Sequence, residues 1–111
     1  MTIDNLDVVD RIAWHPKTGE VGLMIIDHLE WTEDDQSNKE HMYLLQEKIN
    51  RYLAFIESGE IYQSYPKARG REPVIIVLAL DPMNQEAEAF FEEMKAFLLK
   101  AGHKIRLEPL S

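Results

Sequence analysis

An uninterrupted apolar run, VIIVLAL, occupies residues 74–80 and is bounded by Pro73 and by the Asp81-Pro82 pair. The run is too short to cross a membrane and short for a helix, and its β-branched residues are typical of strands. A strand with apolar side chains at every position is covered on both of its faces. The run therefore predicts the central strand of a sheet, with the rest of the chain paired to it or packed on it.

Length and charge limit the architecture and the partners. The chain has 111 residues, which suits a single domain spanning residues 1–111. With 12 Lys and Arg against 20 Asp and Glu, the net charge of −8 repels nucleic acid and anionic membranes. There is no cysteine, which excludes disulfides and thiolate chemistry. The first residues are acidic, unlike a signal peptide, and no apolar stretch reaches transmembrane length, so we expect a cytoplasmic protein.

Two strands are predicted before the first helix. Residues 8–14 (VVDRIAW) carry apolar side chains at every second position. Residues 21–27 (VGLMIID) carry apolar side chains on both faces of the predicted strand. The turn-forming segment 15–19 (HPKTG) separates them, a pattern typical of a β-hairpin. We expect the first of these strands at the edge of the sheet and the second in its interior.

The first predicted helix covers residues 37–58. The spacing of Ser37 and Glu40 is that of a capping box, and Gly59 stands where a left-handed residue would end the helix. Its apolar stripe comprises Met42, Leu45, Ile49, Tyr52, Leu53 and Ile56.

A second helix is predicted from Asn84 to the residue before Gly102. Its stripe comprises Ala87, Phe90, Phe91, Met94, Phe97, Leu98 and Ala101, and we expect Phe90, Met94 and Phe97 to be core residues. Residues 104–108 (KIRLE) alternate strictly and predict a last strand with one wet face. Residues 60–71 show no sustained period, and we expect a loop there.

The element order is therefore ββαβαβ, an α+β two-layer sandwich with a four-stranded mixed sheet and two helices. In the strand order 1-2-3-4 both helices lie on one face, and the middle strands then present Val, Leu and Ile to water on the other. A large exposed apolar face usually binds a partner, so we expect a twofold homodimer. The alternatives are helices on opposite faces, or the 60–71 loop folded across the open face.

Two stretches of the chain are similar to known sequences. They are residues 26–31 (IDHLEW) and residues 45–60 (LQEKINRYLAFIESGE), followed by the Tyr65-Pro66 and Gly70-Arg71 pairs. In these stretches the chain resembles a family of small uncharacterised bacterial α/β proteins, and the resemblance covers most of its length. The resemblance implies a domain of unknown function and assigns no catalytic residue.

Three side chains are expected to converge where two strands end. Asp27 and His28 follow the second strand, and Asp81 follows the central strand. The carboxyl ends of parallel strands are the usual place for ligands, and this set suits acid–base chemistry or a hard metal ion. Glu30 could join from the loop. The alternative is that both aspartates stabilise turns and that His28 is solvated.

Four basic residues are candidates for binding an anionic ligand. Lys48 falls within the apolar arc of the first helix, where it is either a buried cation or extends its ammonium group to water. Lys67, Arg69 and Arg71 surround Gly70 and could hold a phosphate or a carboxylate. The alternative for these three residues is an ordinary solvated loop.

Two functions of different class follow from these features. No complete catalytic, nucleotide-binding or metal-binding motif is present, so we expect no metal and no cofactor. The leading interpretation is a non-enzymatic interaction module, immunity- or adaptor-like, that pairs with itself or with a basic protein and not with nucleic acid or membrane. The alternative is a small-ligand or metal-dependent enzyme with its site at the carboxyl ends of strands 2 and 3.

Overall fold

Four strands form one mixed sheet in the computed structural model, which describes residues 11–14 and 17–109. The strands are β1 (Arg11–Trp14), β2 (Val21–Asp27), β3 (Pro73–Ala79) and β4 (Lys104–Pro109), in the order β1-β2-β3-β4. β1 is antiparallel to β2, and β2, β3 and β4 are mutually parallel. The predicted mixed sheet is confirmed. Residues 8–10 of the predicted first strand, and residues 15–16 of the predicted turn, lie outside the described residues.

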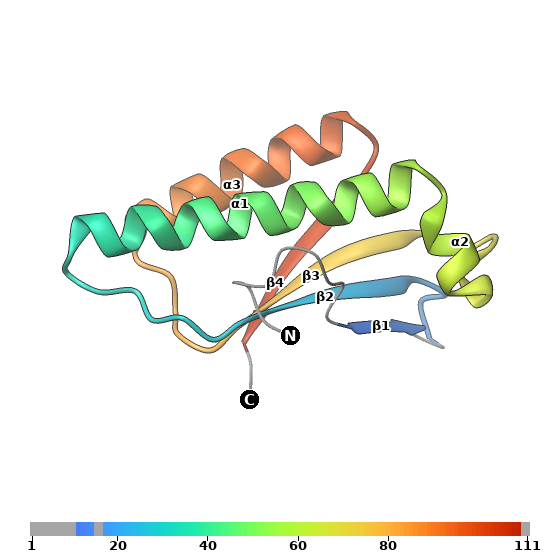
Figure 1. Cartoon of the computed structure of the whole chain (residues 1–111), viewed down its shortest axis with the longest axis horizontal. Helices are drawn as coiled ribbons and strands as arrows, with labels where there is room; N and C mark the ends of the chain where they lie inside the picture. The colour runs from blue at the N-terminus through green and yellow to red at the C-terminus, as the bar shows by residue number, and fades with distance from the viewer. Residues whose placement is uncertain (1–10, 15–16, 110–111) are drawn as a thin grey trace.

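Two long helices cover one face of this sheet (Figure 1). α1 (Asp35–Glu57) lies between β2 and β3 in the sequence, and α3 (Gln85–Lys100) connects β3 to β4. The predicted two-layer α+β sandwich is confirmed. Within the described part of the chain, no helix is long and apolar enough to cross a membrane.

The predicted loop at residues 60–71 is wrong, because the segment contains a short helix, α2 (Glu60–Ser64), and a 3-10 turn, η1 (Pro66–Ala68). Gly59 has φ 82°, a left-handed conformation that ends α1 and lets α2 begin at the next residue. Ile61 of α2 is fully buried. A helix of 5 residues is too short to show a hydrophobic period, which is why the sequence pattern did not predict it.

The predicted capping box of α1 is also wrong, because the N-cap is Asp34 and not Ser37. The Asp34 carboxylate accepts the backbone N–H of Gln36 at 3.3 Å and the hydroxyl of Ser37 at 2.7 Å. The hydroxyl of Ser37 holds the pKa of the Asp34 carboxyl below its usual value. With Asp34 as the N-cap, Asn38 and His41 lie in the first two turns of α1, and both are buried.

The hydrophobic core lies between the sheet and the helices. β2 and β3 contribute alternate side chains on the helix-facing side, and α1 and α3 contribute residues at helical spacing. Members of this core include Leu23, Ile25, Leu45, Ile49, Tyr52, Ile75, Val77, Phe91 and Leu98. The hydroxyl of Tyr52 donates to the carbonyl of Met24 at 2.6 Å, which satisfies its polar end inside the core.

The predicted core position of Phe97 is wrong, since 67% of this residue is exposed. α3 buries Phe91 and Leu98, while Phe90 and Met94 are only partly buried. At 100° per residue, Phe97 lies about 120° around the helix from Phe91. The hydrophobic period therefore locates the buried stripe correctly but overestimates its width.

The face of the sheet opposite the helices is less exposed than expected. Val74 and Ile76 project from this face, yet they are only 0% and 7% exposed, so the prediction that β3 leaves them in water is wrong. Ile76 packs over Gly22, where an added Cβ would lie 2.8 Å from its Cδ1. Arg106 of β4 reaches across β3 to bind Glu20 at 2.9 Å, and this hydrogen bond lowers the pKa of the Glu20 carboxyl.

Candidate functional site

The carboxyl ends of β2 and β3 lie together, and Leu80 donates its backbone N–H to the carbonyl of Asp27 at 2.9 Å. The side chain of Asp27 is 1% exposed. Its carboxylate oxygens lie 2.8 Å and 2.7 Å from Nε2 of His41, and one of them also accepts the N–H of Leu29 at 3.2 Å. Asp27 and His41 therefore form a buried acid–imidazole pair that joins the end of β2 to α1.

His41 belongs to the face of α1 that packs on the sheet. It stands four residues before Leu45 and seven before Lys48, so all three residues share one side of the helix. The ring of Trp31 stacks on the imidazole, with 3.6 Å between centroids and 13° between planes. An ionised carboxylate has no proton to give, so Nε2–H of His41 donates to Asp27, and in the neutral ring Nδ1 carries the lone pair. Asp27 thus sets the tautomer, and Trp31 sets the plane of the ring.

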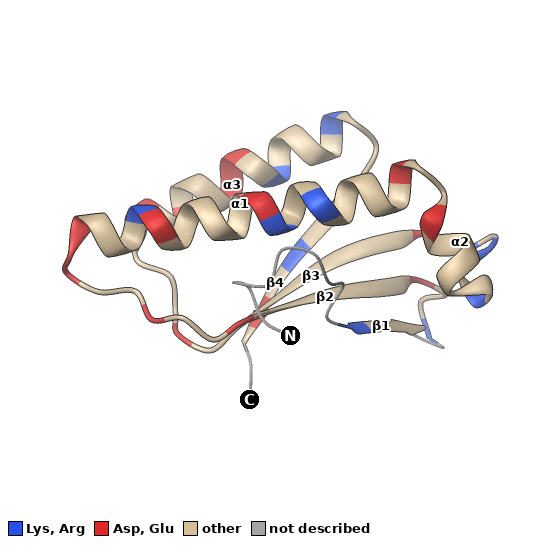
Figure 2. Cartoon of the chain, viewed as in Figure 1, with Lys and Arg blue, Asp and Glu red and all other residues tan. Residues whose placement is uncertain are grey.

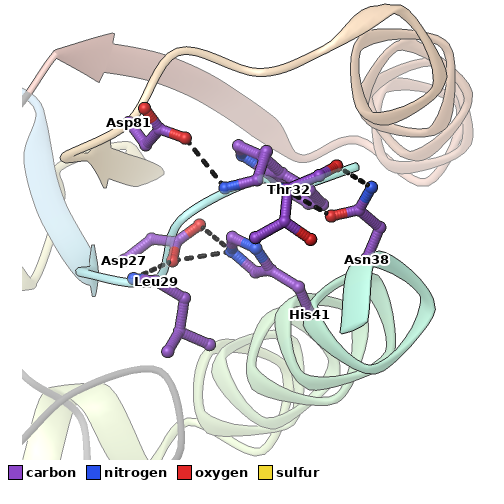
Figure 3. A network of polar contacts seen from close by, with 7 residues as sticks. Asp27, Leu29, Thr32, Asn38, His41 and Asp81 are labelled. Atoms are coloured by element: carbon purple, nitrogen blue, oxygen red, sulfur yellow. Dashed lines mark hydrogen bonds and ion pairs between the residues drawn. The ribbon is translucent and has the colours of Figure 1, made fainter. Parts of the chain in front are cut away.

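Further hydrogen bonds hold the loop between β2 and α1 on both sides (Figure 3). Asp81, which follows β3, accepts the backbone N–H of Trp31 at 2.8 Å. Asn38 of α1 accepts the N–H of Thr32 at 2.9 Å and donates to its carbonyl at 2.7 Å. These bonds fix the loop that carries Trp31, and so they hold the indole against the imidazole.

Two buried side-chain atoms of this network lack a hydrogen-bond partner among the described residues. They are Nδ1 of His41 and Nε1 of Trp31, which belong to the two stacked rings. Leaving a buried polar group unpaired costs about 1–3 kcal/mol. Such groups are rare in native proteins, and a water, an ion or a ligand commonly satisfies them. The stacked rings are therefore the strongest sign of a ligand in the described part of the chain.

A surface cavity of about 560 Å³ lies beside His41, between the β2–α1 loop and the first turns of α1. Its volume is within the usual range of small-molecule sites. The lining includes His28, Leu29, Glu30, Glu40, His41 and Leu44. Among the described residues that line it, none is Lys or Arg. The cavity therefore combines carboxylates, imidazoles and an apolar wall, without a basic side chain.

The structure separates the three side chains that were predicted to converge. Asp27 is buried and pairs with His41, whereas His28 is exposed and lines the cavity. Asp81 holds the backbone of Trp31. Asp27 and Asp81 thus act on the same loop, but the three residues do not form one reactive set. A functional role for each of them stays a prediction.

The candidate anion-binding residues lie elsewhere. Lys48 is fully buried, so the alternative in which its ammonium group extends to water is wrong. Its Nζ lies 5.7 Å from the centre of the Tyr52 ring. The buried position agrees with the other interpretation, a buried cation, and a role in ligand binding stays a prediction.

The basic cluster after α2 is engaged with aromatic rings. The guanidinium group of Arg71 lies 4.2 Å from the ring centre of Trp14, and that of Arg69 lies 5.9 Å from the ring centre of Tyr62. Nε of Arg71 also donates to the carbonyl of Lys67 at 2.8 Å. Each arginine therefore has an aromatic partner within the chain, and phosphate or carboxylate binding by this cluster stays a prediction.

Sequence reasoning missed His41, the central residue of the site. The available signal was a row of positions, 38, 41, 45, 48 and 52, that recur every three or four residues and are all buried. Asn38 and His41 are the first two members of this row. A polar residue at a buried helical position needs a partner, and Asp27 at the end of a buried strand is a natural one.

No group of three or more His, Asp or Glu side chains is placed to hold a metal ion in the part of the chain that the structure describes. The unpaired atoms of the stacked rings are a donor and, in the neutral imidazole, an acceptor. His41 is among the described residues that line the cavity and Trp31 is not, so only the imidazole lies beside a ligand bound there.

Comparison with known proteins places the chain in a family without assigning a role to it. A family model described as "Family of unknown function (DUF6572)" matches residues 1–111, so the chain belongs to this family. The chain matches no curated protein and no solved structure.

Proposed function

We propose that this member of a family of unknown function binds a small organic molecule in the cavity beside His41. Nδ1 of His41 would exchange a hydrogen bond or a proton with the ligand. The observation that carries the proposal is this imidazole, which is 3% exposed, borders a cavity of about 560 Å³ and leaves Nδ1 without a partner among the described residues. A buried ring nitrogen in a native protein usually has a hydrogen-bond partner, and a ligand in this cavity would supply one.

The surrounding residues prepare His41 for this role. The Asp27 carboxylate accepts Nε2–H, which directs the lone pair to Nδ1 and stabilises the imidazolium that forms if Nδ1 takes up a proton. Trp31 holds the ring plane. Asp27 and Trp31 are positioning residues, because they act through His41. The same geometry serves plain binding or general-base catalysis on a substrate whose acidic proton reaches Nδ1.

A fragment screen by two-dimensional NMR on the ¹⁵N-labelled full chain tests the proposal. We expect binding fragments to shift the backbone signals of Leu29, Thr32, Glu40 and His41, and the imidazole ¹⁵N signals of His41, because these groups surround the cavity. His103 is the internal control, since it is also a histidine paired with a carboxylate, with Nε2 3.1 Å from Glu57. Its imidazole signals should stay unchanged. Fragments that bind only elsewhere, or no binding fragment at all, would contradict the proposal.

A second candidate is the interaction module, acting as a homodimer or with a basic protein. Burial of Val74 and Ile76 removes the sheet face as its main argument. Support comes instead from α3, where Phe97 and Leu99 are 67% and 64% exposed. We propose a dimer at micromolar concentration, to be measured by sedimentation equilibrium. A single species of 12.9 kDa would rule it out.

A cytoplasmic location is part of both proposals. It is supported by the lack of cysteine and by the acidic composition, with a net charge of −8. The same charge supports the proposal that neither nucleic acid nor an anionic membrane is a partner.

A further inference from the structure

We infer that the ligand of the His41 cavity is a small organic cation, with a primary ammonium group on a short aliphatic chain. This inference rests on the proposed function, because it names the ligand class of the same cavity. It follows from the kinds of polar group that line the cavity, from the charges around it and from its apolar wall.

The charged groups that line this cavity are the carboxylates of Glu30 and Glu40. The hydroxyl groups of Thr32 and Ser37 also line it, and each can donate or accept a hydrogen bond. Nδ1 of His41 is buried at the wall of the cavity and has no hydrogen-bond partner among the described residues. With the ring proton on Nε2, toward Asp27, this nitrogen is an acceptor. Glu30 makes no hydrogen bond or ion pair with another described residue. Glu40 receives one weak bond, from the side chain of Gln36 at 3.4 Å. An ammonium group has three N–H donors and no acceptor, so it matches this set.

The charges around the cavity also select a cation. The β2–α1 loop and the first turn of α1 add Glu33, Asp34 and Asp35, and Figure 2 shows acidic residues gathered at this end of the molecule. The nearby Lys39 is paired with Asp35 at 3.2 Å. The charge of the whole chain, −8, has the same sign. A cavity lined by one sign of charge raises the local concentration of the opposite ion and repels anions.

The apolar wall of the cavity indicates that the part of the ligand beyond its ammonium group is aliphatic. Leu29 and Leu44 line the cavity beside the polar groups, and they can cover methylene groups of a ligand. Removing a CH₂ group from water contributes about 0.8 kcal/mol. A short aliphatic amine therefore satisfies the acceptors with its ammonium group and the wall with its chain.

Three four-carbon compounds that differ only in their end groups test the inference: 1,4-diaminobutane, 1,4-butanediol and succinate. Each is titrated into the ¹⁵N-labelled full chain, and the backbone signals of Leu29, Glu40 and His41 are followed by NMR. We expect saturable shifts with the diamine, binding at least about tenfold weaker with the diol, and none with succinate. A tenfold difference corresponds to about 1.4 kcal/mol.

Two double variants separate a specific site from general attraction by an acidic protein. Glu30→Gln with Glu40→Gln removes two charges from the cavity, and Glu92→Gln with Glu93→Gln removes two from the exposed side of α3. We expect the first pair to weaken diamine binding about tenfold or more, and the second to change it by less than about twofold. Equal weakening by both pairs would overturn the inference.

The outcomes also separate this inference from the proposed function. If the diol or a neutral fragment shifts the cavity signals and the diamine does not, the cation assignment is overturned while the cavity remains a ligand site. If neither the three compounds nor the fragment screen shifts these signals, both are overturned.

Discussion

Replacing Asp27 with alanine is expected to lower the free energy of unfolding by about 2–6 kcal/mol, because it leaves two donors unpaired at about 1–3 kcal/mol each. The change leaves Nε2–H of His41 without its acceptor in a position that is 3% exposed. It also removes the acceptor of the Leu29 N–H. Urea denaturation at neutral pH measures the loss.

Asp81→Ala is the matched control for this prediction. Asp81 also follows a strand of the sheet and accepts a single backbone N–H, that of Trp31, in a part-buried position. We expect it to cost about 1–2 kcal/mol, within the range for one unpaired buried donor. If Asp27→Ala lowers the free energy of unfolding no more than Asp81→Ala does, the acid–imidazole pair is not a main contact between β2 and α1.

Phe91→Ala is expected to lower the free energy of unfolding by about 3–5 kcal/mol, whereas Phe97→Ala should change it by less than about 0.5 kcal/mol. The two residues lie on one helix, but Phe91 is 4% exposed and Phe97 is 67% exposed. Truncation at Phe91 opens a cavity between α3 and the sheet, and truncation at Phe97 removes atoms that already contact water. Chemical denaturation of the two variants against the unmutated chain compares them directly.

A large decrease in the free energy of unfolding on Phe97→Ala would mean that a partner or a second copy covers this side of α3 in solution. The measurement is therefore repeated over a range of protein concentrations. A loss that grows with concentration indicates association, because only a binding partner makes apparent stability depend on concentration. A large loss that is independent of concentration would contradict the position of Phe97 in the fold.

The sheet was largely predictable from local patterns. The apolar run at 74–80 indicated a strand covered on both faces, and the alternation at 104–108 indicated a strand with one wet face. That β2, β3 and β4 are parallel followed from the strand–helix–strand connections. The order 1-2-3-4 was one of the arrangements left open, and the structure shows it. The pattern did not show that Ile76 packs over Gly22, because that contact depends on the register between β2 and β3.

The candidate site was only half predictable. The position of Asp27 and Asp81 at neighbouring strand ends followed from the parallel topology. Their partners did not: Asp27 binds a histidine 14 residues further along, and Asp81 holds a backbone group 50 residues away. His28 follows Asp27 directly and was the nearest imidazole in the sequence. The pattern of a strand does not tell which residue of a later helix contacts its end, so it gave no reason to prefer His41.

The sequence by itself determined the four strands, the two long helices, the class of the fold and the acidic charge, because hydrophobic period, helix-ending glycines and composition act over a few residues and need no long-range contact. Only the tertiary structure decided which histidine meets Asp27, that Lys48 is buried and that Phe97 is not. Each of these depends on the rotation of a helix about its own axis as it packs on the sheet. A helix can turn by a few tens of degrees without breaking its pattern, so the contacts at the edges of its buried stripe are set by the packing of the whole core.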